Sequence, residues 1–141
     1  MTCFFDTSVL VPVFYGDHEH HQASIDLFAD CDPSTGCCAT HSLAEVYATL
    51  TRMPGKHRIS GDQAMLFINN IREHLEVVSL DEHDYREALE RCARVGIVGG
   101  TTYDAMLAQC ALKNNASTLY TWNLRHYRLV GPDIEGIVRT P

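Results

Sequence analysis

Residues Cys3-Phe4-Phe5-Asp6-Thr7-Ser8 form a short apolar run that ends in a carboxylate and two hydroxyl side chains. A second apolar segment follows at once, which is typical of a buried strand, a tight turn and the start of a helix. In a parallel α/β sheet, ligands bind at the carboxyl ends of the strands. A carboxylate at such an edge is costly unless a positive group lies beside it. Asp6 is therefore the first candidate for a functional site.

The rest of the chain alternates between strand-like and helical patterns. Strands that are separated by helical segments require crossover connections, which predicts a parallel sheet with helices on both faces. We expect strands at 2–6, 36–39, 76–79, 118–122 and, weakly, 136–139, and helices at 8–15, 19–31, 42–53, 60–74, 82–95, 102–114 and, as a short turn, 123–128. The length of 141 residues is that of one domain, so residues 1–141 are predicted to fold as a single unit.

The composition limits the classes of function. The net charge of −7 argues against non-specific binding of nucleic acid, but it does not exclude a nuclease, because acids at a metal site count in that total. No apolar run approaches the roughly 18 residues of a membrane span, and Met1-Thr2-Cys3 lacks the basic start of a signal peptide. We therefore expect a cytoplasmic protein with no membrane contact. The six cysteines form no C-x-x-C pair and are expected to be free thiols.

Two further acids are expected at the same edge as Asp6. Glu45 lies at the start of the helix that follows strand 36–39, and Asp104 lies in the opening turn of helix 102–114. Capping boxes are expected at Ser42-Leu-Ala-Glu45, Ser60-Gly-Asp-Gln63 and Ser79-Leu-Asp-Glu82, with a looser version at Thr101-Thr-Tyr-Asp104. Helix capping alone is therefore the alternative interpretation of Glu45 and Asp104. The placement of Glu45 directly after a strand, and of Asp104 in the opening turn of a core helix, nevertheless predicts that the three carboxylates converge. Oxygen ligands of this kind suit Mg²⁺ or Mn²⁺.

Strand 118–122 ends in Thr121-Trp122-Asn123, which adds polar groups to this edge. The Thr121 hydroxyl is expected to reach Asp6 or a metal-bound water; the alternative is an ordinary β-branched strand residue. Two divalent ions about 4 Å apart can activate water and stabilise the leaving oxygen of a phosphodiester. The acidic edge is thus suited to phosphodiester hydrolysis.

Four segments in this order resemble a known family: Phe5-Asp6-Thr7-Ser8, Ser42-Leu-Ala-Glu45-Val-Tyr, Tyr103-Asp104-Ala105 and Thr121-Trp-Asn123-Leu-Arg-His126-Tyr127. Together they resemble the PIN-domain ribonucleases, and the chain length resembles the VapC-like toxins of type II toxin–antitoxin systems. The resemblance covers essentially the whole chain. It implies a three-layer PIN-like fold with a central parallel sheet of about five strands flanked by helices.

The resemblance also implies the chemistry. It identifies a metal-dependent endoribonuclease that uses Mg²⁺ or Mn²⁺, with Asp6, Glu45 and Asp104 as catalytic metal ligands and Thr121 and Asn123 as further catalytic residues. It implies RNA as substrate, a cognate antitoxin that blocks the site, and a homodimer. Asn123 departs from the family, which often has a fourth acid there. An amide oxygen can bind a metal but brings no charge, so a weak second metal site is expected.

Other polar clusters leave alternatives open. Arg52, Lys56 and Arg58 form the tightest basic cluster, either a solvated loop or a phosphate grip that binds RNA beside the acids. His18, His20 and His21 have no third ligand type at a fitting spacing nearby, which favours an exposed polar face over a zinc site.

Two other functions compete with the ribonuclease. One is a PIN-like module with weakened catalysis that only binds RNA or protein, which Asn123 favours. The other is a phosphatase of the acid-edge α/β class, which would require a second Asp at the position of Ser8.

Overall fold

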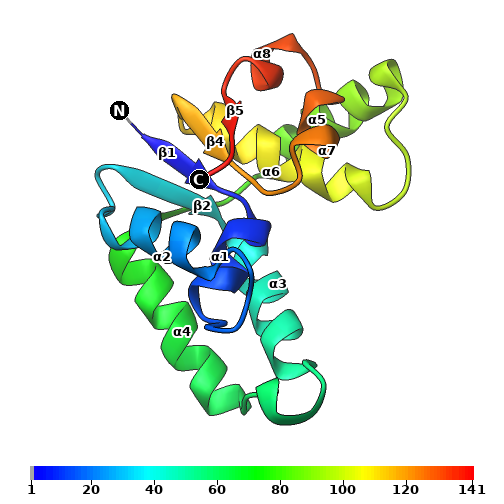
Figure 1. The fold of residues 1–141 in the computed structure, drawn as a ribbon. Helices are drawn as coiled ribbons and strands as arrows, with labels where there is room; N and C mark the ends of the chain where they lie inside the picture. The colour runs from blue at the N-terminus through cyan, green and yellow to red at the C-terminus, as the bar shows by residue number, and fades with distance from the viewer. Residues whose placement is uncertain (1) are drawn as a thin grey trace.

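The computed structural model describes residues 2–141 and has a five-stranded parallel sheet at its centre (Figure 1). The strands are β1 (Cys3–Phe5), β2 (Gly36–Ala39), β3 (Glu76–Val78), β4 (Thr118–Tyr120) and β5 (Val138–Arg139). Their order in the sheet is β3-β2-β1-β4-β5, so β1 is central. The predicted α/β class and parallel sheet are confirmed. The carboxyl ends of β1, β2 and β4 therefore meet at one edge.

Helices cover both faces of the sheet, as the sequence pattern predicts. Figure 1 shows α1 to α4 below the sheet and α5 to α8 on its other side. The helices are α1 (Thr7–Val13), α2 (His21–Ala29), α3 (Thr40–Thr51), α4 (Gly61–His74), α5 (Glu82–Val95), α6 (Thr101–Lys113), α7 (Leu124–Arg128) and α8 (Pro132–Glu135). A 3-10 turn, Gly55–His57, and the helix α8 lie where no element was predicted.

Alternation along the strands divides the core into two halves. Phe4 and Cys37 pack with the residues of α5 to α8, whereas Phe5 and Cys38 pack with those of α1 to α4. Successive side chains of a strand point to opposite faces, so each strand contributes to both halves. All four of these side chains are fully buried. The central strand that carries Asp6 is consequently anchored from both sides.

The helix starts confirm one predicted capping box and correct another. Ser60 accepts a hydrogen bond from the backbone of Gln63 and completes a capping box at the start of α4. The box expected at Ser79 is wrong, because Asp81 and Asp84 cap α5 instead. An aspartate carboxylate accepts from the helix N–H groups as well as a serine hydroxyl does. The Ser79 hydroxyl is left to contact Thr40 on α3.

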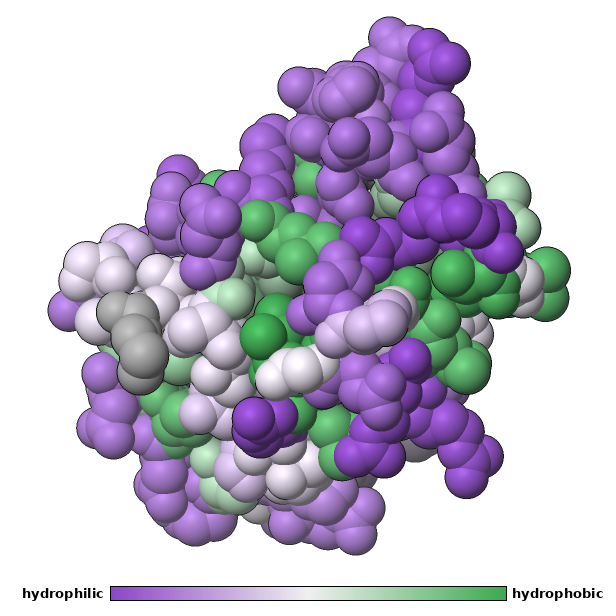
Figure 2. Space-filling model, turned by 90° about the horizontal axis from the view of Figure 1, so that it is seen from above, coloured by the Kyte–Doolittle hydropathy of each residue, from purple (hydrophilic) through white to green (hydrophobic). Residues whose placement is uncertain are grey.

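The face seen in Figure 2 is mainly polar, and the cysteines are free, as the sequence predicts. On the face seen in Figure 2, hydrophilic residues surround a few groups of hydrophobic ones. No helix within residues 2–141 is long and apolar enough to cross a membrane. All six cysteines are free, and four of them are buried, so they act as small core residues.

Candidate metal and phosphodiester site

Asp6 lies where β1 ends and α1 begins. Its backbone N–H donates to the Tyr120 carbonyl in the sheet, and its carbonyl accepts from the N–H groups of Val9 and Leu10 in the helix. Extended backbone angles of −67° and 154° place it as the residue before the first helical turn. Only 3% of Asp6 is exposed to solvent. The tight strand-to-helix turn inferred from the sequence is confirmed, and it holds the carboxylate inside the edge of the sheet.

Three hydroxyl groups donate to the Asp6 carboxylate. Ser8 and Thr121 donate to Oδ2 at 2.6 and 2.8 Å, and the Tyr127 hydroxyl donates to Oδ1 at 2.6 Å. The reach of Thr121 to Asp6 is thus confirmed. Tyr127 was not singled out in the sequence, although it is fully buried and its pKa is raised well above the ordinary value by burial and by the nearby Asp6 charge. Hydrogen bonds to a charged acceptor are among the stronger ones in proteins.

Glu45 lies on α3 and faces the end of β1. The Thr7 hydroxyl donates to Glu45 Oε1 at 2.9 Å and lies equally close to the hydroxyl of Ser42. The capping box expected at Ser42 is wrong, because α3 begins two residues earlier, at Thr40, and Ser42 is buried inside the helix. Glu45 therefore belongs to the second turn. It nevertheless points to the predicted edge, and His41 Nε2 lies 3.7 Å from its Oε1.

Asp104 lies in the first turn of α6 and faces the other two acids. Its Oδ2 is 3.0 Å from Nδ1 of His126. Burial and the charges of Asp6 and Glu45 raise the pKa of Asp104 to about 6, against an opposing effect of His126. A like charge raises a carboxyl pKa only when it lies near, so the three acids share one electrostatic site. The predicted convergence at one edge is supported by this coupling.

Asn123 lies at the outer rim of the same site. Its backbone N–H donates to the Thr121 hydroxyl at 2.9 Å, and its exposed side chain makes no capping hydrogen bond to α7. His126, on the following turn, is exposed and pairs with Asp104. The rim thus presents one amide and one imidazole to solvent.

The donor set suits a hard divalent cation. Each carboxylate can accept about four hydrogen bonds; Asp6 accepts three from side chains, Glu45 one, and Asp104 one from His126 at Oδ2. Oxygen lone pairs therefore remain on all three acids for an ion that keeps several of its waters. Within residues 2–141, no three His, Cys, Asp or Glu side chains are grouped closely enough to hold an ion by themselves. Metal binding by Asp6, Glu45 and Asp104 stays a prediction.

The basic cluster lies beyond the end of α3. Arg52 follows the last turn, Lys56 lies in the turn Gly55–His57, and Arg58 donates through Nε to the Met53 carbonyl at 3.0 Å. All three cations are exposed. Arg52 is seven residues from Glu45, which is about 10 Å along a helix axis. Their role toward RNA stays a prediction.

The histidines before α2 are held by protein contacts. His20 stacks on Trp122 with ring centroids 3.7 Å apart, its backbone N–H donates to His18 Nδ1, and His21 Nδ1 lies 2.7 Å from the Pro12 carbonyl. Burial is the main cause that lowers the pKa of His18. Among residues 2–141 these histidines belong to no group that could hold a metal ion. All three are half-buried, so the exposed polar face that the sequence favours is wrong.

Comparison with known proteins identifies the family of this arrangement. The model of the PIN domain family matches residues 3–131. Ribonuclease VapC40 of Mycobacterium tuberculosis is 33% identical over 121 residues, which are 85% of this chain and 85% of that protein. Ribonuclease VapC27 of the same species is 32% identical over 112 residues, covering 79% of this chain and 77% of that protein.

Solved structures share the fold at lower identity. The crystal structure of VapBC2 from Rickettsia felis, bound to a promoter DNA fragment, aligns with a TM-score of 0.68 at 19% identity and covers 99% of this chain and 98% of that one. VapC20 of Mycobacterium tuberculosis, described as a sarcin-ricin loop cleaving toxin, has a TM-score of 0.69 at 20% identity and covers 86% and 89%. The chain belongs to the PIN domain family and, within it, to the VapC ribonucleases.

Proposed function

We propose that the protein is a Mg²⁺- or Mn²⁺-dependent endoribonuclease that hydrolyses RNA phosphodiester bonds as the toxin of a toxin–antitoxin pair. Relationship to the VapC ribonucleases supports the reaction. The observation that carries the proposal for this chain is the electrostatic coupling of Asp104 to Asp6 and Glu45. Two carboxylates that raise the pKa of a third form with it a site that favours cations, and phosphates that bring cations with them.

The side chains around the acids have separate tasks in this proposal. A bound divalent ion would activate water and stabilise the charge that develops on the phosphodiester. Asp6, Glu45 and Asp104 would hold it. The hydroxyls of Ser8, Thr121 and Tyr127 fix the orientation of Asp6, and Thr7 fixes Glu45. Catalytic geometry depends on such supporting contacts, because small displacements of the reacting groups lower the rate strongly.

Cleavage of RNA in Mn²⁺ tests this proposal directly. We expect the protein to cleave single-stranded RNA, and the variant Asp6→Asn to lose at least about a hundredfold in rate, since a ligand charge is lost where catalysis depends on it. Asp26→Asn is the matched control, because Asp26 is exposed and its carboxylate accepts a hydrogen bond from Gln22 on the same helix. Equal rates for Asp6→Asn and the unmodified protein would contradict the proposal.

The alternative of a weakened, binding-only module rests on the neutral Asn123 at the rim. It predicts RNA affinity without cleavage at any Mn²⁺ concentration. The same assay therefore separates the two functions, provided that binding and cleavage are measured on one oligonucleotide.

We further propose that Arg52, Lys56 and Arg58 bind RNA phosphates on one side of the cleaved bond. Their exposure, and the position of Arg52 about 10 Å from Glu45 along the axis of α3, suit contacts one or two nucleotides away. Changing all three to Gln should weaken binding for every RNA sequence and flatten its dependence on salt. An unchanged salt slope would remove them from the interface.

A cognate antitoxin and a homodimer complete the proposal. The VapBC structures from Rickettsia felis and nontypeable Haemophilus influenzae share this fold, which supports a partner of the same class. We expect expression of the chain to arrest growth and co-expression of the antitoxin to relieve it. Sedimentation of the purified protein measures the oligomeric state, with a two-fold dimer as the expected form.

A further inference from the structure

A cavity of about 500 Å³ opens beside the acids and has no role in the function proposed so far. It lies over the ends of β2 and β3, between the first turns of α3 and α6 and the start of α5. Its walls are mainly apolar and include Ala44, Leu80, Tyr85 and Met106. Clefts of this size and composition are typical of sites for small organic groups.

Two aromatic rings line the cavity on the side of the acids. His41 and Tyr103 lie parallel, with an angle of 7° between their planes and 5.6 Å between their centroids. The Tyr103 residue is 56% exposed although it is large and apolar. His41 Nε2 is 3.7 Å from Glu45 Oε1, and Tyr103 directly precedes Asp104. The two rings therefore connect the cavity to two of the three acids.

Hydroxyl groups supply the polar part of the lining. The oxygens of Thr40 and Ser79 lie 2.6 Å apart, and Thr40 also donates to the Val78 carbonyl at 3.3 Å. Both residues are exposed. A hydroxyl can both donate and accept a hydrogen bond, so this pair can bind a donor or an acceptor on the edge of a ligand.

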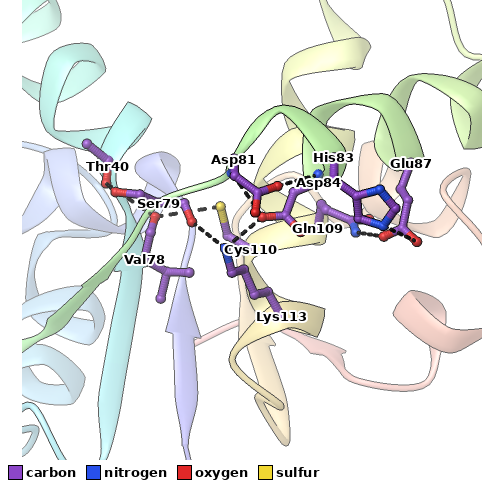
Figure 3. A network of polar contacts seen from close by, with 10 residues as sticks. All are labelled: Thr40, Val78, Ser79, Asp81, His83, Asp84, Glu87, Gln109, Cys110 and Lys113. Atoms are coloured by element: carbon purple, nitrogen blue, oxygen red, sulfur yellow. Dashed lines mark hydrogen bonds and ion pairs between the residues drawn. The ribbon is translucent and has the colours of Figure 1, made fainter.

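The wall around Ser79 is held in place by α6. Lys113 Nζ donates to the Ser79 carbonyl at 3.0 Å and to Asp84 Oδ2 at 2.6 Å, which ties the end of β3 to α5 (Figure 3). Cys110 adds a weak contact to the Val78 carbonyl. The hydroxyl pair is thus presented by a braced segment, and preformed sites lose less free energy on binding.

We propose that this cavity receives one unpaired nucleobase of the RNA, next to the phosphate held at the acids. The base stacks on Tyr103 and His41 and directs its polar edge toward Thr40 and Ser79. This inference rests on the proposed ribonuclease function. Aromatic faces with adjacent hydrogen-bonding groups are what proteins use for splayed-out bases in single-stranded RNA. An aliphatic side chain of a protein partner could pack on the rings but would make no hydrogen bond to the hydroxyl pair.

Binding to RNA with single abasic nucleotides tests the site without changing the fold. A single-stranded oligonucleotide and versions with one base removed at successive positions are titrated onto the Asp6→Asn variant in Mn²⁺. We expect removal at one position beside the cut to weaken binding on the order of tenfold, the effect of one base stacked on an aromatic side chain. Other positions should change affinity much less.

Variants of Tyr103 identify the partner of that base. Tyr103→Leu should weaken binding of the intact RNA by about the same factor and abolish the difference between intact and abasic RNA. Tyr103→Phe keeps the ring and should retain both. In the cleaving protein, Tyr103→Leu should raise KM more than it lowers kcat. Tyr47→Leu is the matched control, because Tyr47 is 40% exposed on α3 but does not line the cavity.

The outcomes separate this inference from the proposed function. If the protein cleaves RNA while every abasic position and Tyr103→Leu leave affinity unchanged, the base site is wrong and the ribonuclease stands. If neither cleavage nor RNA binding occurs, both are wrong. If Tyr103→Leu weakens only the binding of the antitoxin, the cavity belongs to a protein partner and the base site is likewise overturned.

Discussion

Asp6 and Asp104 lie at the same edge of the sheet but in opposite surroundings. Asp6 is 3% exposed and accepts hydrogen bonds from three hydroxyls, so it is part of the folded framework. Asp104 is half-buried, has one histidine partner, and has its pKa raised to about 6 by burial and by the other two acids. The carboxylate of Asp6 is thus held by hydrogen bonds within the fold, whereas the carboxylate of Asp104 keeps lone pairs free for a ligand. Four predictions test this contrast.

Removing the inner acid should have the largest effect on stability. Asp6→Ala leaves the hydroxyls of Ser8, Thr121 and Tyr127 without their acceptor, and a buried unpaired polar group costs about 1–3 kcal/mol. We expect the free energy of unfolding to fall by about 3 kcal/mol, because Ser8 and Thr121 can partly pair with each other. Urea denaturation measures it. Asp104→Ala is the comparison within the site and should lose less stability. An equal loss of unfolding free energy in both variants would contradict the difference between the two acids.

Removing one donor to the inner acid should have an intermediate effect. Tyr127→Phe deletes the hydroxyl that donates to Asp6 Oδ1 and leaves the fully buried ring in place. A hydrogen bond to a charged group contributes about 1.5–3 kcal/mol, and we expect a loss near the lower value. Thermal and urea unfolding are the measurements. Tyr120→Phe, where the half-buried ring packs on Phe5, should change stability by less than half as much.

Adding a negative charge at the outer rim should strengthen metal binding at the site. Asn123 is exposed next to Thr121, so Asn123→Asp brings a fourth carboxylate to the site without disturbing buried contacts. Affinity for hard cations rises with the number of charged ligands, and we expect Mg²⁺ to bind on the order of fivefold more tightly. Calorimetric titration measures the change. Equal affinity in both proteins would show that Asn123 does not face the metal.

An effect of similar, small size is expected for the dependence of stability on pH in metal-free protein. The pKa of Asp104 is about 6 in the folded state and 3.8 as an ordinary aspartate, so the folded state binds its proton more tightly. The contribution of Asp104 to stability is therefore greatest below about pH 4 and is lost as the pH rises through 6. We expect a change of about 1 kcal/mol after allowance for solvent screening.

Asp104→Asn provides the control for this pH effect. The asparagine does not titrate, so the difference in unfolding free energy between the two proteins should vary between pH 4 and 6 and be constant above 7. Saturating Mg²⁺ should reverse the slope, because a cation favours the ionised carboxyl. A difference that is independent of pH would mean that Asp104 does not lie close to the other acids.

Much of the fold was predictable because its signals are local. The apolar run before Asp6, the strand Gly36–Ala39 and the periodic helices α4 and α5 were predicted to within one or two residues. Helix α8 was missed, since a single turn has too few residues to show a period. The start of α3 was misplaced because Ser42 carries a capping pattern, while its hydroxyl is used by Thr7 from another element.

The acids of the site were predictable from the sequence, but the residues that hold them by hydrogen bonds were not. Glu45 lies on the helix that directly follows β2, and the topology brings the end of that strand to the edge where Asp6 lies. Asp104 lies on α6, which follows α5 rather than a strand, so its place in the site was indicated by the opening turn of a core helix and by the family resemblance. Tyr127 carries no local signal of its contact, because the 121 residues that separate it from Asp6 are bridged only when α7 packs on α6 and β5. His41 and Tyr103 likewise meet only where α3 and α6 flank the same cavity.

The sequence alone was enough to predict the order of strands and helices, because hydrophobic periodicity and strand ends depend on neighbouring residues. The order of the segments that resemble the PIN family indicated that family and the three acids. Only tertiary contacts show that Asp6 is enclosed by hydroxyl groups, whereas Asp104 is half-buried and lies close to the other acids. They also show where the rings of His41 and Tyr103 meet. These properties depend on distances and burial between residues far apart in the chain, and such contacts form only when the two halves of the core pack on the sheet.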